Sequence, residues 1–110
     1  MEFTIKEKQA LSKVLGDLIR ADGKVDVSEA EQMFMIFTHF QISTQIQEDG
    51  RKLTSEQALE ILGKMDRDKR AEIVKYMHEM ADADGQLDHN EMKLILKVIH
   101  PERDLKITRK

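Results

Sequence analysis

Apolar residues recur every three or four positions along most of this chain, which is the period of an amphipathic α-helix. Only one proline and five glycines interrupt the pattern, and these two residue types are the strongest local breakers of helices. We therefore expect an all-α fold, a compact bundle of about five to seven helices. The predicted helices span about 5–21, 27–40, 54–63, 66–82 and 88–101, with a short helical turn after residue 43.

The same periodicity predicts which side of each helix faces the core. Residues at i, i+3, i+4 and i+7 lie on one side of a helix, so an apolar stripe at these positions indicates the buried side. The predicted stripes are Leu11, Val14, Leu15 and Leu18; Ala30, Met33, Phe34, Phe37 and Phe40; Ala58, Leu59 and Leu62; Ile73, Met77 and Met80, with Tyr76 on the flank; and Met92, Ile95, Leu96, Val98 and Ile99. Most of the seven methionines fall on these stripes, so we interpret them as core residues rather than as a Met-rich binding groove.

Polar residues predict where the helices begin and end. Thr54 and Gln57 have the spacing of a capping box, in which each side chain accepts a hydrogen bond from the other residue's amide. Ser43 and Asp66 precede other helical stretches and are expected to be N-caps. The Asp49-Gly50 pair is a turn signal, so we expect the chain to turn there.

One short phrase occurs twice. Residues 21–29 and 83–91 both read Ala-Asp-Gly-x-apolar-Asp-x-x-Glu, at an offset of 62 positions. In each copy the glycine would stop one helix, and the aspartate with the later glutamate would cap the next. Flanking apolar positions also match at this offset: Leu11 with Ile73, Leu15 with Met77, Leu18 with Met80, Met33 with Ile95 and Phe37 with Ile99. We therefore predict two helix-turn-helix halves related by a pseudo-two-fold axis.

The second copy is similar to a calcium-binding EF-hand loop, which has ligands at positions 1, 3, 5, 7, 9 and 12 and a glycine at position 6. Met80 takes position 1, where a thioether cannot replace a hard oxygen ligand. With Gly85 at position 6, positions 3, 5, 9 and 12 hold Asp82, Asp84, Asp88 and Glu91. Capping and shaping the turn would account for every shared position of the phrase, and the alternative left open is a weak site for Ca²⁺ or Mg²⁺ at these four carboxylates.

The first copy is the weaker candidate for metal binding. In the same register Leu18 takes position 1 and Arg20 takes position 3, where a guanidinium would repel a cation. We therefore interpret the first copy as a structural turn.

Composition narrows the classes of function. The chain has 110 residues, 40% hydrophobic and 35% charged, and we expect residues 1–110 to form one domain with a frayed tail at 102–110. The net charge is −3 with both signs mixed, which argues against a nucleic-acid partner. The absence of cysteine excludes disulfides, zinc-thiolate sites and cysteine nucleophiles. No apolar stretch approaches the ~18 residues that cross a bilayer, so we expect a cytoplasmic protein.

The repeated phrase, at Ala21 to Glu29 and again at Ala83 to Glu91, resembles the TerB-like family, which includes tellurite-resistance-associated proteins and the N-terminal domain of the DjlA co-chaperone. The resemblance covers roughly residues 11–99. It implies a bundle with pseudo-two-fold symmetry, a role in bacterial stress responses, and protein contacts at the cytoplasmic side of the membrane. It also implies an acidic, metal-binding surface, which maps by position to Asp22, Asp26 and Glu29, and to Asp84, Asp88 and Glu91.

No catalytic motif is recognisable, because the chain has no glycine-rich phosphate loop and no nucleophile motif beside a plausible histidine base. We interpret His78 and Asp82, at i and i+4, as a surface hydrogen-bonded pair, and His39 as isolated and partly exposed. Our first hypothesis is a non-enzymatic protein-interaction or scaffold module with a protein partner; the sequence leaves a homo-oligomer open. The alternative is a degenerate EF-hand-like calcium sensor that uses residues 82–91.

Overall fold

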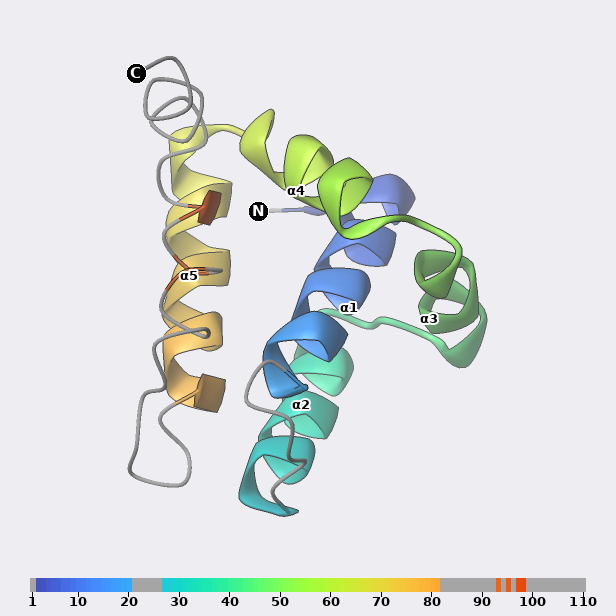
Figure 1. Cartoon of the computed structure of the whole chain (residues 1–110), viewed down its shortest axis with the longest axis vertical. Helices are drawn as coiled ribbons and strands as arrows, with labels where there is room; N and C mark the ends of the chain where they lie inside the picture. Colours follow the sequence, from blue (N-terminus) through green and yellow to red (C-terminus); the bar gives the residue numbers. More distant parts are fainter. Residues whose placement is uncertain (1, 21–26, 82–92, 94, 96, 99–110) are drawn as a thin grey trace.

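The computed structural model of the chain describes residues 2–20, 27–81, 93, 95, 97 and 98 (Figure 1). In these residues the chain forms five α-helices and no strand, which confirms the predicted all-α fold. None of these helices is long and apolar enough to cross a membrane. The helices are α1 (Ile5–Ile19), α2 (Val27–His39), α3 (Thr44–Arg51), α4 (Ser55–Gly63) and α5 (Arg67–Ala81).

The last predicted helix is described only at residues 93, 95, 97 and 98, which are helical. The predicted helix stops at 23, 85 and 101, the predicted caps at 26 and 88, and the tail at 102–110 lie outside the described residues.

Side-chain caps determine where four of the helices begin. The predicted caps are confirmed for α3, α4 and α5 by hydrogen bonds from the amides of Ile46 to Ser43, Gln57 to Thr54 and Lys69 to Asp66. A further capping box starts α1: the Glu7 amide donates to Thr4 Oγ1 at 3.1 Å, and the Thr4 amide donates to the Glu7 carboxylate at 2.9 Å. These local hydrogen bonds satisfy amides that have no partner within their own helix.

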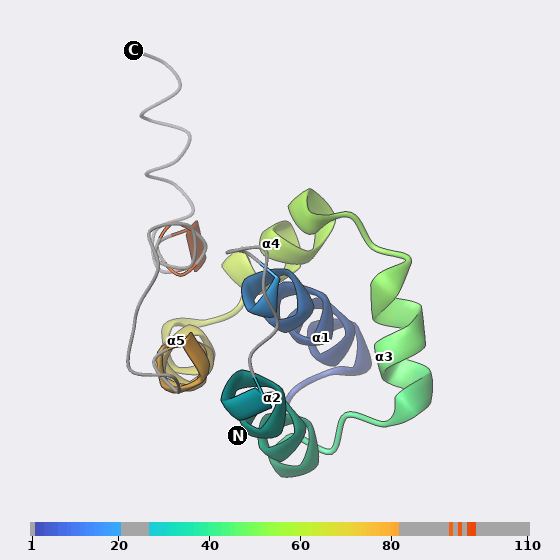
Figure 2. The same ribbon diagram turned by 60° about the horizontal axis from the view of Figure 1, so that its bottom comes forward.

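α1 is the centre of the bundle. It packs against α2, α3, α4 and α5, and α2 also packs against α5 (Figure 1, Figure 2). The predicted stripe of α1 is confirmed, because Leu11, Val14, Leu15 and Leu18 are at most 1% exposed. The other buried apolar residues of the core are Ala10, Ile19, Ile36, Phe40, Ile42, Ala58, Leu62, Met65, Ile73, Met77, Met80, Ile95 and Val98.

The Asp49-Gly50 pair lies inside α3, so the predicted turn at this point was wrong. Gly50 is instead required where α3 meets α1. A Cβ at Gly50 would lie 2.6 Å from the backbone carbonyl oxygen of Gln9, well inside van der Waals contact. Glycine therefore allows the two helices to approach more closely than any other residue would.

The buried side of α2 differs from the predicted stripe. Phe34 is 70% exposed, whereas Ile36, which the stripe omitted, is 1% exposed. The other members of the stripe are at least partly buried: Ala30, Met33, Phe37 and Phe40. The prediction for Phe34 was wrong because α2 carries apolar residues on both sides, so the period alone does not identify the buried one.

α2 ends in a Schellman motif. The Ile42 amide donates to the Phe37 carbonyl at 2.8 Å, and the Gln41 amide donates to the Thr38 carbonyl at 3.2 Å. Gln41 has φ 56°, in the left-handed region that glycine adopts most easily. The motif turns the chain sharply away from α2 and keeps Phe40 and Ile42, on either side of Gln41, in the core.

Equivalent positions of the two repeat copies are buried alike on the helix that precedes each phrase. Leu11 and Ile73, Leu15 and Met77, and Leu18 and Met80 are all at most 1% exposed. The helix after the second phrase is described at only four residues, so the pseudo-two-fold relation stays a prediction.

Candidate functional site

The acidic turns singled out by the sequence lie mostly outside the described residues. This applies to the predicted metal ligands Asp82, Asp84, Asp88 and Glu91, and to Asp22 and Asp26 of the predicted acidic surface. Within the ranges that the structure describes, no group of three or more His, Asp or Glu side chains could hold a metal ion. The site for Ca²⁺ or Mg²⁺ therefore stays a prediction of the sequence.

Glu29 is the one member of the predicted acidic surface that the structure describes. Its side chain is only 1% exposed, so it belongs to the interior and its assignment to the surface is corrected. Glu29 lies in the first turn of α2, where the partial positive charge of the helix N-terminus stabilises a carboxylate. This position gives Glu29 a structural role at the start of the helix. His78 is exposed on α5, and Asp82, its predicted partner, lies outside the described residues.

The outward side of α2 is the most apolar exposed surface of a helix in the described part. Val27, Phe34 and Met35 are 74%, 70% and 62% exposed; among the described residues, the only other large apolar side chain this exposed is Ile5, on α1. At about 100° per residue, the three α2 positions fall within about 100° of one another around the helix. Two further exposed residues, Glu31 and Thr38, lie on the same side of the helix. We call this side the α2 face: Val27, Glu31, Phe34, Met35 and Thr38.

The α2 face continues into an open groove where the chain passes from α2 to α3. The groove has a volume of about 420 Å³, and none of the residues that line it is charged. These residues are Phe34, Phe37, Thr38, Gln41, Ile42, Ser43, Thr44 and Gln47. Apolar rings therefore lie beside hydroxyl and amide groups, which can donate or accept hydrogen bonds. We call this feature the α2–α3 groove.

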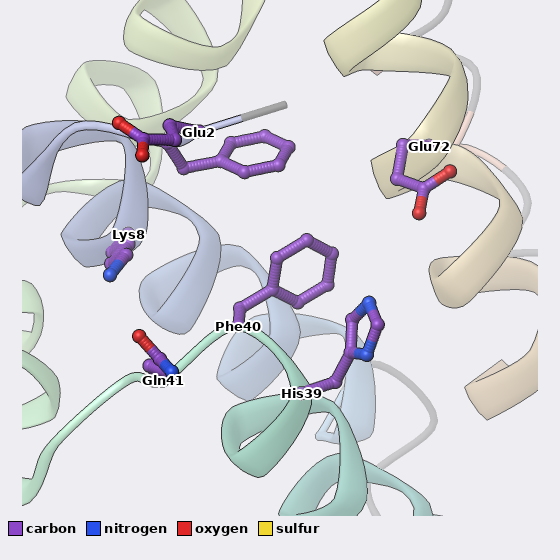
Figure 3. Close-up of a pocket in the computed structure, with 7 residues that line it drawn as sticks. Glu2, Lys8, His39, Phe40, Gln41 and Glu72 are labelled. Carbon is purple, nitrogen blue, oxygen red and sulfur yellow. The ribbon is translucent and has the colours of Figure 1, made fainter.

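A second hollow, the α1–α2–α5 cavity, lies among the start of α1, the end of α2 and α5 (Figure 3). Its volume is about 520 Å³. Figure 3 shows Glu2, Lys8 and Gln41 on one side of the Phe40 ring, with Glu72 on the other side. The cavity is lined by Glu2, Phe3, Lys8, His39, Phe40, Gln41 and Glu72.

Aromatic contacts hold this cavity together. The Phe40 ring forms T-shaped contacts with the rings of Phe3 and Tyr76, with centroid distances of 5.1 Å and 5.2 Å. The Tyr76 hydroxyl lies 3.1 Å from His39 Nε2, and this hydrogen bond joins α5 to α2. His39 also contacts the ring of Phe40. The prediction that His39 is isolated was therefore wrong.

A largely buried ion pair joins α1 to α5 beside the aromatic cluster. Lys69 Nζ lies 2.9 Å from Glu7 Oε1 and 5.4 Å from the centroid of the Phe3 ring. The Lys69 and Glu7 side chains are 18% and 16% exposed. Burial raises the pKa of Glu7, but hydrogen bonds from Thr4 and Lys69, together with the charge of Lys69, outweigh burial and hold the pKa below its usual value.

The pattern of the sequence did not single out these residues, because their partners are distant in the chain. His39 and Tyr76 are 37 positions apart, and Glu7 and Lys69 are 62 apart. Only the Thr4-x-x-Glu7 spacing is local, and it could have been recognised as a capping box.

Comparison with known proteins relates the chain to one family and to one solved fold. The sequence profile of the family described as "Tellurite resistance protein TerB" matches residues 8–101. A protein of unknown function from Porphyromonas gingivalis W83, PG1108, has a similar crystal structure, with a TM-score of 0.76 and 24% sequence identity over 89% of this chain and 77% of that chain. No curated protein matches the sequence. At this identity the structural likeness shows a shared fold.

Proposed function

The chain belongs to the TerB family, and we propose that it is a non-enzymatic protein-interaction module whose contact surface is the α2 face. The observation that carries the proposal is the grouping of Val27, Phe34 and Met35, each more than 60% exposed, on one side of one helix. Single exposed apolar side chains are ordinary on soluble proteins. A group of them beside a groove is typical of a surface that a partner covers.

Covering the α2 face would supply much of the free energy of an interface. Burying one fully exposed Phe, Val or Met side chain contributes roughly 1.5–3 kcal/mol. Phe34 is the best-placed anchor, because it belongs to the α2 face and also lines the α2–α3 groove. Aromatic side chains at the centre of an interface often carry a large share of its binding energy.

The lining of the α2–α3 groove defines the chemistry of the partner. Its polar groups are hydroxyls and amides such as Ser43 and Gln47, so a partner would not have to strip water from an ion there. We propose that the partner presents an apolar segment, such as one side of an amphipathic helix, with polar groups at its edge. The description of the family as a tellurite resistance protein supports a bacterial stress response as the setting of this contact.

Capture of partners from cells that express the protein tests this function. Changing Phe34→Ser together with Met35→Ser should abolish recovery of the partner and preserve the fold, because both side chains are exposed. Ile5→Ser is the matched control, since Ile5 is as exposed as Met35 but lies on α1. Partners are crosslinked to the protein before capture, and the proteins recovered with the wild type and with each variant are compared by quantitative mass spectrometry. Equal recovery with the wild type and the double variant, or equal loss with Ile5→Ser, would contradict the proposal.

A divalent cation at the second repeated phrase is a separate proposal, supported by four carboxylates at EF-hand spacing: Asp82, Asp84, Asp88 and Glu91. Calorimetry with CaCl₂ and MgCl₂ tests it. Binding that is lost in Asp84→Asn would support a site, and a closed-to-open change on binding would favour the calcium-sensor alternative. The absence of binding heat at millimolar ion, with an unchanged Tm, would contradict both.

A further inference from the structure

The α1–α2–α5 cavity carries more negative than positive charge. Glu2 and Glu72 are carboxylates, and Lys8 is the one lysine or arginine among the lining residues. In the part of the chain that the structure describes, neither Glu2 nor Glu72 forms an ion pair. Figure 3 shows Glu72 across the cavity from Lys8, with the Phe40 ring between them. The Glu72 end of the cavity therefore holds a carboxylate that Lys8 does not neutralise.

The end of α2 adds to the negative potential of the cavity. α2 ends at His39, and the next two residues, Phe40 and Gln41, line the cavity. The last carbonyl groups of a helix give its C-terminus a partial negative charge, which favours cations within about one turn. The helix end and the Glu72 carboxylate thus attract the same kind of ligand.

Lys69 shows how the adjoining cluster already accommodates an ammonium group. Its Nζ donates a hydrogen bond to Glu7 Oε1 at 2.9 Å and lies 5.4 Å from the centroid of the Phe3 ring. Phe3 also lines the cavity. On the cavity side, Phe40 and Glu72 offer the same combination of an aromatic ring and a carboxylate, and no cation–π contact to Phe40 occurs among the described residues.

From these observations we infer that the α1–α2–α5 cavity binds an organic cation, with its ammonium or guanidinium group between Glu72 and the Phe40 ring. An aromatic ring attracts a cation within about 6 Å of its centroid, and a carboxylate adds a charge-assisted hydrogen bond. A volume of about 520 Å³ is far larger than a metal ion needs and lies in the range of small-molecule pockets. The cation is either a free amine or the lysine or arginine side chain of another protein.

An NMR titration of the full chain tests the inference and distinguishes the two sources. Putrescine represents a free amine, and N-acetyl-L-arginine amide represents a protein side chain. N-acetyl-L-citrulline amide is the matched neutral control, because it replaces the guanidinium with a urea group of similar shape. We expect saturable shifts at His39, Phe40 and Glu72 with at least one cationic probe, and none with the citrulline probe at the same concentrations.

Variants locate the binding. Glu72→Gln removes the charge with little change in size, so it should weaken binding about tenfold by loss of a charge-assisted hydrogen bond. Glu56→Gln is the matched control, since Glu56 is exposed on α4 and does not line the cavity. Shifts with putrescine alone would support a free amine, and shifts with the arginine probe alone would support a partner side chain.

Three results would overturn the inference. The first is that neither cationic probe binds below about 10 mM, which is weaker than one aromatic contact and one charge-assisted hydrogen bond should allow. The second is that the citrulline probe binds as tightly as the arginine probe. The third is that Glu72→Gln leaves the affinity unchanged.

Discussion

α1 and α2 are neighbouring amphipathic helices of similar length, 15 and 13 residues, but their apolar residues have different roles. The single stripe of α1 is wholly buried, because α1 packs against all four other described helices. α2 packs mainly against α1 and α5 among these helices, and it carries apolar residues on its exposed side as well as on its buried side. α2 therefore has two apolar surfaces. One packs in the core of the bundle, and the other is exposed.

The largest expected effect separates the two helices. Leu15→Ala removes a fully buried side chain of α1 and leaves a cavity, so the free energy of unfolding should fall by about 3 kcal/mol. Phe34→Ala removes a larger side chain, but one that is 70% exposed, so the fall should be no more than about 0.5 kcal/mol. Urea denaturation followed by circular dichroism measures both. Equal losses of unfolding free energy in the two variants would place Phe34 in the core and contradict the difference between α1 and α2.

Substitutions of two glycines test how closely other parts of the bundle pack against α1. Gly50→Ala places a methyl group 2.6 Å from the Gln9 carbonyl oxygen. α3 must then move away from α1, and the free energy of unfolding should fall by roughly 1–3 kcal/mol. In Gly16→Ala, on α1 itself, the new methyl meets only the flexible guanidinium of Arg20 at 3.4 Å. The better helix propensity of alanine should then raise the free energy of unfolding by up to about 1 kcal/mol.

The same urea denaturation measures both glycine variants, and each serves as the control for the other. A gain in stability for Gly50→Ala would contradict the close approach of α3 to α1. A large loss for Gly16→Ala would mean that the space beside α1 is tighter than the contact with Arg20 indicates.

A smaller effect is expected for the Glu7–Lys69 pair, which joins α1 to α5. Folding lowers the pKa of Glu7, so the unfolded chain binds more protons near that pKa and stability rises with pH there. The contribution is fully present above the carboxyl's ordinary value of 4.5 and is lost as the pH falls through the lower folded value. Glu7→Gln should lower the free energy of unfolding by about 1 kcal/mol at neutral pH, and by much less in acid.

Denaturation of the wild type and Glu7→Gln across about pH 2 to pH 7 measures this difference. The two curves should approach one another as the pH falls from 4.5 and converge below the lower folded pKa, where Glu7 is protonated in both the unfolded and the folded chain. Curves that stay parallel over the whole range would show that the pair contributes no pH-dependent stability.

Helix positions could be predicted from the sequence because they depend on local chemistry. The caps at Ser43, Thr54 and Asp66 are confirmed, since each side chain bonds to an amide three residues away. The neighbour that a residue meets across the bundle is not local. Phe34 was therefore assigned to the wrong side of α2, and Gly50 was assigned to a turn although its close neighbour is Gln9.

The candidate sites depend still more on distant contacts. His39 meets Tyr76, and Phe3 and Phe40 line one cavity with Glu72, only because three helices converge there. The repeated phrase shows that a resemblance cannot supply such contacts either. Its resemblance to the TerB-like family implied an acidic surface, but the fold buries Glu29, the one acidic residue of the phrase that the structure describes.

The central claim is that the α2 face is a binding surface and that the apolar stripe of α1 serves only the core. Site-specific photo-crosslinking in cells tests it most directly, with p-benzoylphenylalanine replacing Phe34 in one protein and Ile5, exposed on α1, in its matched control. We predict a discrete adduct with a partner protein from position 34 and none from position 5, with both proteins folded as the wild type. No adduct from position 34, or the same adducts from both positions, would contradict the claim.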